Sequence, residues 1–198
     1  MKLGIQLGLA LVVLLLAYLV YDSVNSSIVF NDLAKQRKDV VVDRLKDVRM
    51  AQIAYKSVNG KYADNFDTLM NFINNGRLPM IFSIGDAEDS VQVAQGLVVR
   101  DTTYVPVKDS LFSKTYLATK THKFYLDSIP FIPFSGGEKF KIAAGEILKN
   151  NVSVKVFEVS CLNPQYLKGM DYHKFDVKKD EGLTLGSMTE PSTNGNWE

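Results

Sequence analysis

The residues able to do chemistry are few, and they lie far apart in the sequence. His122 and His173 each lack a second ligand or an acid–base partner at helical or strand spacing, so we interpret both as surface or packing histidines. The acids of "GDAEDS", Asp86, Glu88 and Asp89, could contact calcium, but their spacing matches no EF-hand loop. We therefore expect no metal site, no cofactor and no catalytic residue, and we do not expect an enzyme.

The remaining candidates are a glycine-rich turn and one cysteine. Ser135-Gly136-Gly137 could bind an anion, but no capped helix follows it directly, and the pattern favours a hairpin or a bulge. Cys161 is the only cysteine, which excludes an internal disulfide and a CxxC zinc or redox motif. The chain has 23 Lys and Arg against 22 Asp and Glu, a net charge of +1. It lacks the basic surplus of nucleic-acid-binding proteins, so we expect no nucleic-acid partner.

The strongest signal is an almost unbroken apolar run from Leu3 to Tyr21, in which Gln6 is the one polar side chain. As a helix this run spans roughly 28 Å, about the thickness of the hydrocarbon core of a bilayer. The alternative is a cleaved signal peptide, which needs a shorter core and an A-x-A-like site, and "AYLVYDSVNSS" offers no clean one. The sequence thus predicts a retained membrane anchor at residues 1–22, with the lipid bilayer as a partner.

Four residues of the anchor have types suited to membrane helices. Tyr18 and Tyr21 lie at its end, where aromatic rings favour the membrane interface. Gly4 and Gly8 form one G-x-x-x-G, which can bring two membrane helices together, although glycine is common in such helices anyway.

The charges that flank the run indicate its orientation. The amino terminus and Lys2 are positive, and Asp22 follows the run, which favours an internal amino terminus and an exported remainder. In a bacterium with two membranes, we expect a single pass through the inner membrane and a C-terminal domain in the periplasm.

A long amphipathic stalk helix is predicted over residues 23–60. From about Asn31, apolar residues recur at steps of three and four. This stripe, the predicted packing face, consists of Val41, Leu45, Val48, Ala51 or Gln52, Tyr55 and Val58. The charged residues around it have mixed signs, and we interpret them as a solvated helix face. No proline occurs before Val58, so "DSVNSS" is the one predicted break in the helix.

The stalk is predicted to end at a turn that leads into the head, residues 61–198. Asn59 and Gly60 both tolerate the left-handed conformation that closes helices, and Tyr62 is expected to fold back beside the stalk. A short second helix follows. Asp64 or Asn65 can cap it, and Gly76 ends it. Its apolar side consists of Phe66, Leu69, Met70 and Ile73.

After Pro79 the pattern changes to short apolar or alternating runs, which predict strands. The runs are "MIFSI", "GLVVR", "TYVPV", "KFYLD", "FKIAA" and "VSVKVFEV". "LKNN" is expected to be a hairpin loop, "IPFIPF" an edge or irregular segment, and Leu183 to Met188 a last short strand. The fold class is therefore α+β: a transmembrane helix continuing into a stalk, a short helix and an antiparallel β-sheet head.

The end of the stalk resembles type IV pilins and the pseudopilins of type II secretion. The resemblance covers Arg44 to Leu69 and rests on Ala51, Ala54, Tyr55, Asn59, Gly60, Tyr62 and Leu69. It implies the same layout and a role as a subunit, or an accessory subunit, of an envelope assembly. Unlike the polymerising members, the chain has no carboxylate between Met1 and Tyr21. It also resembles a class of uncharacterised single-span bacterial envelope proteins with a "GNWE"-like end.

Two functions remain open from the sequence. The first is a membrane-anchored structural or assembly protein whose stripe packs against its own head or a partner, including membrane or envelope proteins and a second copy of itself. The second is a tethered periplasmic module that binds a small ligand or an envelope polymer, suggested by the aromatic content of the head.

Overall fold

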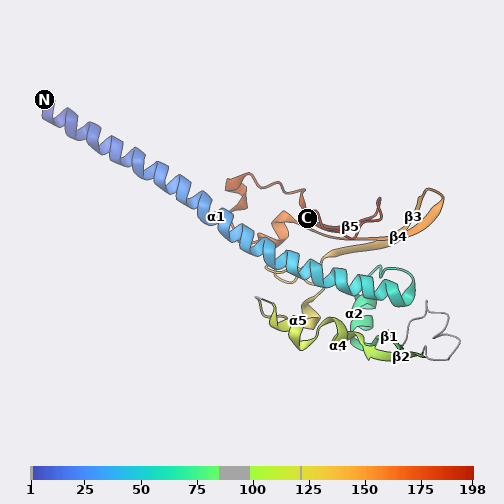
Figure 1. Ribbon diagram of the computed structural model, residues 1–198. Coiled ribbons are helices and arrows are strands. Elements are labelled where there is room, and N and C mark those ends of the chain that lie inside the picture. Colours follow the sequence, from blue (N-terminus) through green and yellow to red (C-terminus); the bar gives the residue numbers. More distant parts are fainter. Residues whose placement is uncertain (1, 85–98, 121) are drawn as a thin grey trace.

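The computed structural model describes residues 2–84, 99–120 and 122–198. Its elements are α1 (Lys2–Asn59), α2 (Phe66–Asn75), β1 (Arg77–Ile84), β2 (Val99–Pro106), α4 (Val107–Leu111), α5 (Lys114–Ala118), η1 (Leu126–Ser128), β3 (Lys141–Lys149), β4 (Val152–Leu162), α6 (Asn163–Tyr166), η2 (Tyr172–Phe175) and β5 (Gly182–Ser187). One long helix, short helices and two small antiparallel sheets make the chain α+β, as the sequence predicts (Figure 1). The acids Asp86, Glu88 and Asp89 lie outside the described residues.

Helix α1 is unbroken from Lys2 to Asn59 and is about 87 Å long at 1.5 Å per residue. The predicted break at "DSVNSS" is wrong. The hydroxyl groups of Ser26 and Ser27 each donate a hydrogen bond to the carbonyl oxygen of Ser23 at 3.0 Å. Serine side chains bound in this way stay within the helix and do not cap a neighbouring turn.

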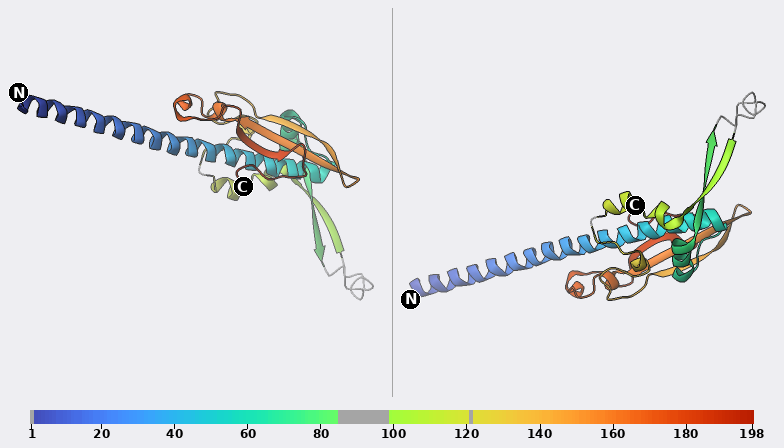
Figure 2. Two further views of the ribbon diagram at one scale, coloured as in Figure 1. Left: turned by 90° about the horizontal axis from the view of Figure 1, so that it is seen from above. Right: turned by 90° about the horizontal axis from the view of Figure 1, so that it is seen from below.

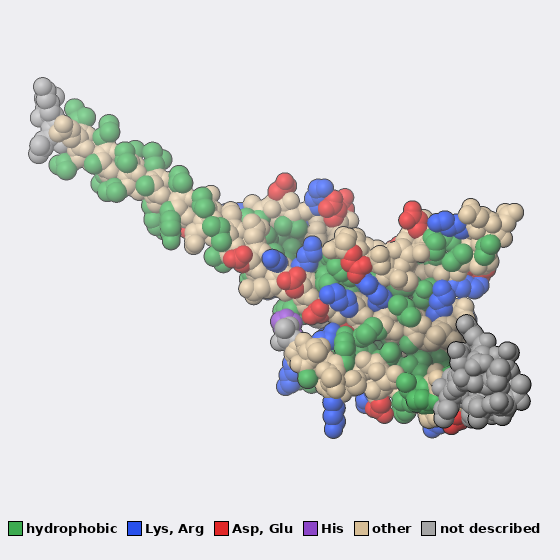
Figure 3. Space-filling view, in the orientation of Figure 1, with side chains coloured by type: hydrophobic (Ala, Val, Ile, Leu, Met, Phe, Trp, Pro, Cys, Tyr) green, Lys and Arg blue, Asp and Glu red, His purple; other side chains and the backbone are tan. Residues whose placement is uncertain are grey.

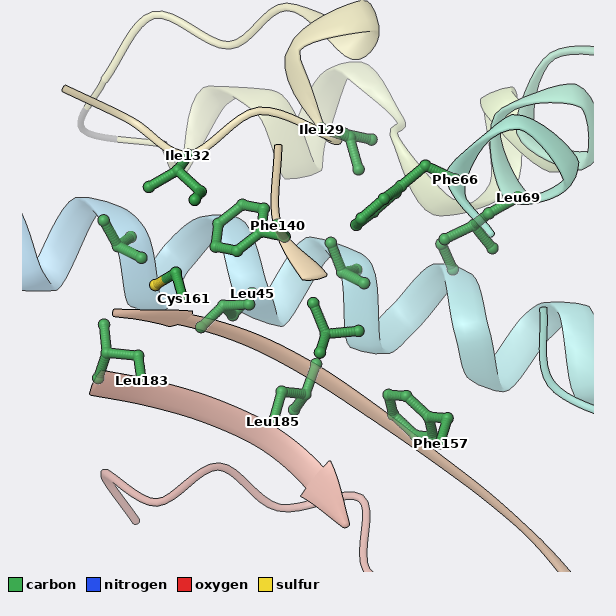
Figure 4. Packing of buried hydrophobic residues seen from close by; sticks show 14 of the residues in the cluster. Leu45, Phe66, Leu69, Ile129, Ile132, Phe140, Phe157, Cys161, Leu183 and Leu185 are labelled. Carbon is green, nitrogen blue, oxygen red and sulfur yellow. The ribbon is translucent and has the colours of Figure 1, made fainter. Parts of the chain in front are cut away.

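The N-terminal part of α1 projects from the molecule, and the C-terminal part lies inside the head (Figures 1 and 2). The sheet of β3, β4 and β5 covers one side of α1, and α2, α4 and α5 lie on the other side. Figure 4 shows the result: Leu45 of α1 lies between Leu183 of the sheet and Ile132 of the loops opposite. The stalk and the head therefore share one hydrophobic core.

The three-stranded sheet has the antiparallel order β3-β4-β5. Asn150 and Asn151 join β3 to β4 with φ values of 50° and 62°, as in a tight hairpin turn, so the loop predicted at "LKNN" is confirmed. The last strand, predicted at Leu183 to Met188, is also confirmed. The tail that follows β5 covers its outer edge, where the N–H of Gly186 donates to the carbonyl of Asn194 at 2.8 Å.

The remaining strand predictions have mixed outcomes. β1 contains "MIFSI". The single strand β2 takes in the end of "GLVVR" and the first four residues of "TYVPV", whose last residue, Val107, begins α4. "KFYLD" is not a strand, because the chain turns there into η1. "IPFIPF" is irregular, as predicted, apart from one isolated bridge between Phe131 and Lys139.

Candidate functional site

The residues that the sequence analysis considers for metal, anion or acid–base chemistry do not form one site. His122 and His173 are both exposed, and the ring of His173 stacks on Tyr172 with 4.3 Å between centroids. The hydroxyl of Ser135 accepts the N–H of Glu138 at 2.9 Å and closes a turn, so this segment is the hairpin that the sequence favours. Within the parts of the chain that the structure describes, no three His, Cys, Asp or Glu side chains form a group that could hold a metal ion.

Cys161 lies on β4 and is buried. Burial raises the pKa of its thiol to about 12, so the reactive thiolate is scarce at neutral pH. We expect a maleimide reagent to leave Cys161 of the native full-length chain unmodified and to modify it fully in denaturant, as measured by intact mass. Fast labelling of the native chain would contradict the burial.

A polar cluster lies where α1 meets α5 and η1. The carboxylate of Asp47, 1% exposed, accepts the hydroxyl of Tyr116 at 2.5 Å and the ammonium group of Lys120 at 2.7 Å. The guanidinium group of Arg44 donates to the carbonyl and the hydroxyl oxygen of Ser128. Burial raises the pKa of Asp47 despite these donors, and the same burial together with Asp47 raises the pKa of Tyr116.

The polar cluster connects α1 to α5 and η1, and it does not enclose a substrate-sized cavity. The hollow beside it, lined in part by Arg44, Asp47 and Lys120, has a volume of only about 20 Å³, which holds about one water molecule and no larger substrate. Its side chains connect α1 to segments about seventy residues later in the chain. The prediction that the charges of α1 form a solvated face is therefore wrong for Arg44 and Asp47.

Two other charges of α1 also hold distant segments. Arg37 donates from Nη1 to the carbonyl oxygens of Tyr166 at 3.2 Å and Lys168 at 2.8 Å. Arg49 pairs with Glu198 at 2.5 Å, next to the chain end. The spacing of apolar residues in α1 cannot indicate these partners, because they lie more than a hundred residues away in the sequence.

The turn at the end of the stalk brings together the residues that the sequence singled out. Gly60 has a φ of 71°, and its N–H donates to the carbonyl of Lys56 at 2.8 Å. The side-chain amide of Asn59 donates to the carbonyl of Tyr55 at 3.0 Å. Tyr62 is buried and returns to α1, where the ammonium group of Lys56 lies 4.7 Å from its ring centroid.

The packing face of the stalk is buried except at its end. Val41, Leu45, Val48 and Tyr55 are all buried, and they contribute to the core. Val58, in the last turn of α1, is 43% exposed, in contrast to its predicted place on this face.

A buried amide that the sequence analysis did not single out fixes this turn. Gln52 is fully buried and pairs with both backbone groups of Ala63: its Nε2 donates to the carbonyl at 2.8 Å, and its Oε1 accepts the N–H at 2.9 Å. The spacing of the apolar stripe allows Gln52 only as an alternative to Ala51. A glutamine on a predicted buried face is the one signal that could have found it.

Gln52→Leu is expected to destabilise the head by about 1–3 kcal/mol for each backbone group of Ala63 left without a partner. The measurement is denaturation of the full-length chain in detergent, followed by the fluorescence of the single tryptophan, Trp197. Gln36→Leu on the exposed surface of α1 is the matched control, with a change within about 0.5 kcal/mol. Equal stabilities of the two variants would contradict the role of Gln52.

The apolar run that is predicted to be an anchor lies outside the head wherever the structure describes its side chains, residues 4–21. Gly4, Gly8, Tyr18 and Tyr21 are exposed, and apart from adjoining residues and the backbone of the helix itself, no atom lies within 4 Å of a Cβ built on either glycine. Figure 3 shows hydrophobic side chains covering this free part of α1. By length and composition α1 can cross a membrane, and its most apolar window has no residue buried in the head, unlike the core helix of a soluble protein.

A second exposed apolar surface is the arm formed by β1 and β2. This two-stranded ribbon projects from the side of the head (Figure 2). Its register places Phe82 opposite Asp101 and Ile81 opposite Thr102, so the exposed side chains of Phe82 and Ile81 point to opposite faces. Met80 and Tyr104 are exposed as well. The arm therefore presents apolar side chains on both faces.

Comparison with protein-family models, with curated proteins and with solved structures finds no match for this chain. The function must therefore be argued from the geometry of these surfaces.

Proposed function

We propose that the chain is a single-pass, membrane-anchored structural or assembly protein that acts through protein–protein contacts of its head. The observation that carries this proposal is the continuity of α1, which runs without a break from an exposed apolar segment into the core of the head. A helix built in this way holds the head at a fixed distance from the membrane. Such an arrangement suits a subunit that positions a binding surface, a role that does not require a catalytic site.

The β1–β2 arm supports the choice of a protein partner. A lone two-stranded ribbon is marginally stable in water, and exposed apolar groups on both of its faces are covered when a partner binds. The occupant we propose is another membrane or envelope protein, or a second copy of the chain. The charge pattern around the apolar run favours a head in the periplasm of a bacterium, anchored in the inner membrane as a pseudopilin-like or accessory subunit.

Site-specific crosslinking in native membranes tests the proposal. A photoreactive amino acid at Ile81, exposed on the arm, is expected to trap one defined protein. The matched control is the same amino acid at Leu148, which is 80% exposed near the β3–β4 turn. Crosslinks to the same species from both positions, or none from Ile81 in the membrane-inserted chain, would contradict a specific contact of the arm.

A ligand-binding module remains the second candidate because a groove of about 550 Å³ runs between α1 and the C-terminal segments. Apolar side chains such as Phe30, Val42 and Leu167 line it together with two lysines and one acid, Lys35, Lys38 and Asp39. The surplus of one positive charge suits an apolar molecule with an acidic group. Thermal unfolding of the full-length chain with long-chain fatty acids tests this candidate. A rise in the unfolding temperature that Lys35→Glu removes would favour ligand binding in this groove. The absence of any rise would exclude long-chain fatty acids as its ligand.

A further inference from the structure

The end of the head that lies nearest the anchor is defined by one aromatic contact. Among residues 4–59 of α1, Phe30 is the first that is buried, and its ring stacks on that of Phe175 with 4.2 Å between centroids and 16° between planes. Phe175 belongs to η2, in the orange-red segment next to the free part of α1 in Figure 1. We call residues 170–175 the tip of the head.

Helix α1 sets the distance between the tip and the membrane. The apolar run ends at Tyr21, nine residues before Phe30, and this separation corresponds to about 13 Å along an unbroken helix. A bilayer of about 40–45 Å with a hydrocarbon core of about 30 Å leaves a headgroup layer of about 5–8 Å on each side. The tip thus begins within about one side-chain length of the headgroups, and the usual helix tilt of about 20° can bring it closer.

The segment between the run and the tip also suits a lipid surface. Val24, Ile28 and Val29 are each more than half exposed. The neighbouring hydroxyl groups of Ser26 and Ser27 are already bonded to the carbonyl of Ser23, which lowers the cost of leaving bulk water. Helix α1 is continuous through this segment, so the tip keeps its position along the helix axis.

The composition of the tip matches the membrane interface. The ring of Tyr172 stacks on His173, and the ammonium group of Lys174 lies 5.7 Å from the ring centroid of Phe175. Tyrosine and lysine are side chains that anchor proteins at the membrane interface, and Tyr172 is half-buried and Lys174 exposed at the tip. Asp171 offsets the charge of Lys174 within the tip, and Asp176 follows the tip, so its net charge is low and a surplus of anionic lipid is not required.

The tip is also held rigidly on α1. Besides the Phe30–Phe175 stack, Arg37 donates to the carbonyl of Lys168, in the segment that leads into the tip. We propose that the tip, residues 170–175, rests on the phospholipid headgroups of the same bilayer that α1 spans, so that the head has a second membrane contact and a fixed orientation. This inference rests on the membrane anchoring in the proposed function.

Fluorescence quenching in phosphatidylcholine vesicles tests the contact. The full-length chain carries Lys174→Cys labelled with a fluorophore, and native Cys161 does not compete because it is buried. With a nitroxide on the lipid headgroup, we expect a several-fold larger loss of fluorescence at position 174 than at Lys61→Cys, which is exposed just beyond the far end of α1. Equal quenching at positions 174 and 61 would overturn the proposal.

Two further variants separate the tip from the anchor. Val12→Cys, in the middle of the apolar run, reports insertion through a nitroxide on the acyl chain. An absence of quenching at position 12 would contradict the membrane anchoring of α1. Quenching at position 12 with equal quenching at positions 174 and 61 would contradict only the contact of the tip with the headgroups. Inserting seven helix-forming residues after Ser27 would lift the tip by about 10 Å and is expected to abolish quenching at position 174. Persistent quenching after the insertion would contradict the distance set by α1.

Discussion

Asp47→Ala is expected to destabilise the head by about 3–5 kcal/mol, the cost of breaking a buried charge pair by removing one partner. The change takes away the acceptor of the Tyr116 hydroxyl and of the Lys120 ammonium group, and Lys120 is itself largely buried. It also removes the negative charge nearest to Arg44. The result is a cationic, desolvated junction between α1 and α5.

Denaturation of the full-length chain in detergent, followed by the fluorescence of Trp197, measures this loss. The matched control is Asp43→Ala, one helical turn earlier, because Asp43 forms an exposed pair with Lys46 at 3.7 Å. Such pairs contribute about 0–1 kcal/mol. Asp47→Asn keeps an acceptor for Tyr116 and is expected to fall between the two. If Asp47→Ala were as mild as Asp43→Ala, the cluster would not hold the head together.

The sequence predicts those elements whose cause is local. The second helix begins at Asn65, whose side chain accepts the N–H of Thr68 at 2.7 Å, and it ends at Gly76. Both residue types are the expected signals for helix ends. The turn at Gly60 and the hairpin at Asn150 have a different local cause, the tolerance of glycine and asparagine for positive φ.

The sequence-based predictions are wrong where the environment of a residue is set by segments far away in the sequence. A stripe of period three to four shows that α1 has one buried face, but it does not show that a second layer covers the opposite side. That layer changes Asp47 from a surface charge into a buried one, and its partners Tyr116 and Lys120 follow in the sequence only after the strands of the arm. The tip is a similar case, since nothing in "YHKF" alone indicates that its Phe175 meets Phe30.

Phe157→Ala is expected to cost about 3–5 kcal/mol, the range for removing a buried phenylalanine from a core. Phe157 is fully buried on β4, and its ring lies 4.5 Å from that of Tyr62, so it joins the sheet to the turn at the end of α1. The measurement is the same denaturation experiment. The matched control is Phe82→Ala on the arm, where the side chain is 56% exposed and the expected change is within about 0.5 kcal/mol.

The same two variants separate the roles of the core and the arm. Because the apolar part of α1 makes no contact with the core, Phe157→Ala is expected to stay in the membrane fraction while its head unfolds more readily. Phe82→Ala is expected to keep its stability and to lose the crosslinks from Ile81. Loss of membrane association in Phe157→Ala would mean that insertion depends on the folded head. Unchanged crosslinking from Ile81 in Phe82→Ala would show that the partner does not contact the face of the arm that carries Phe82.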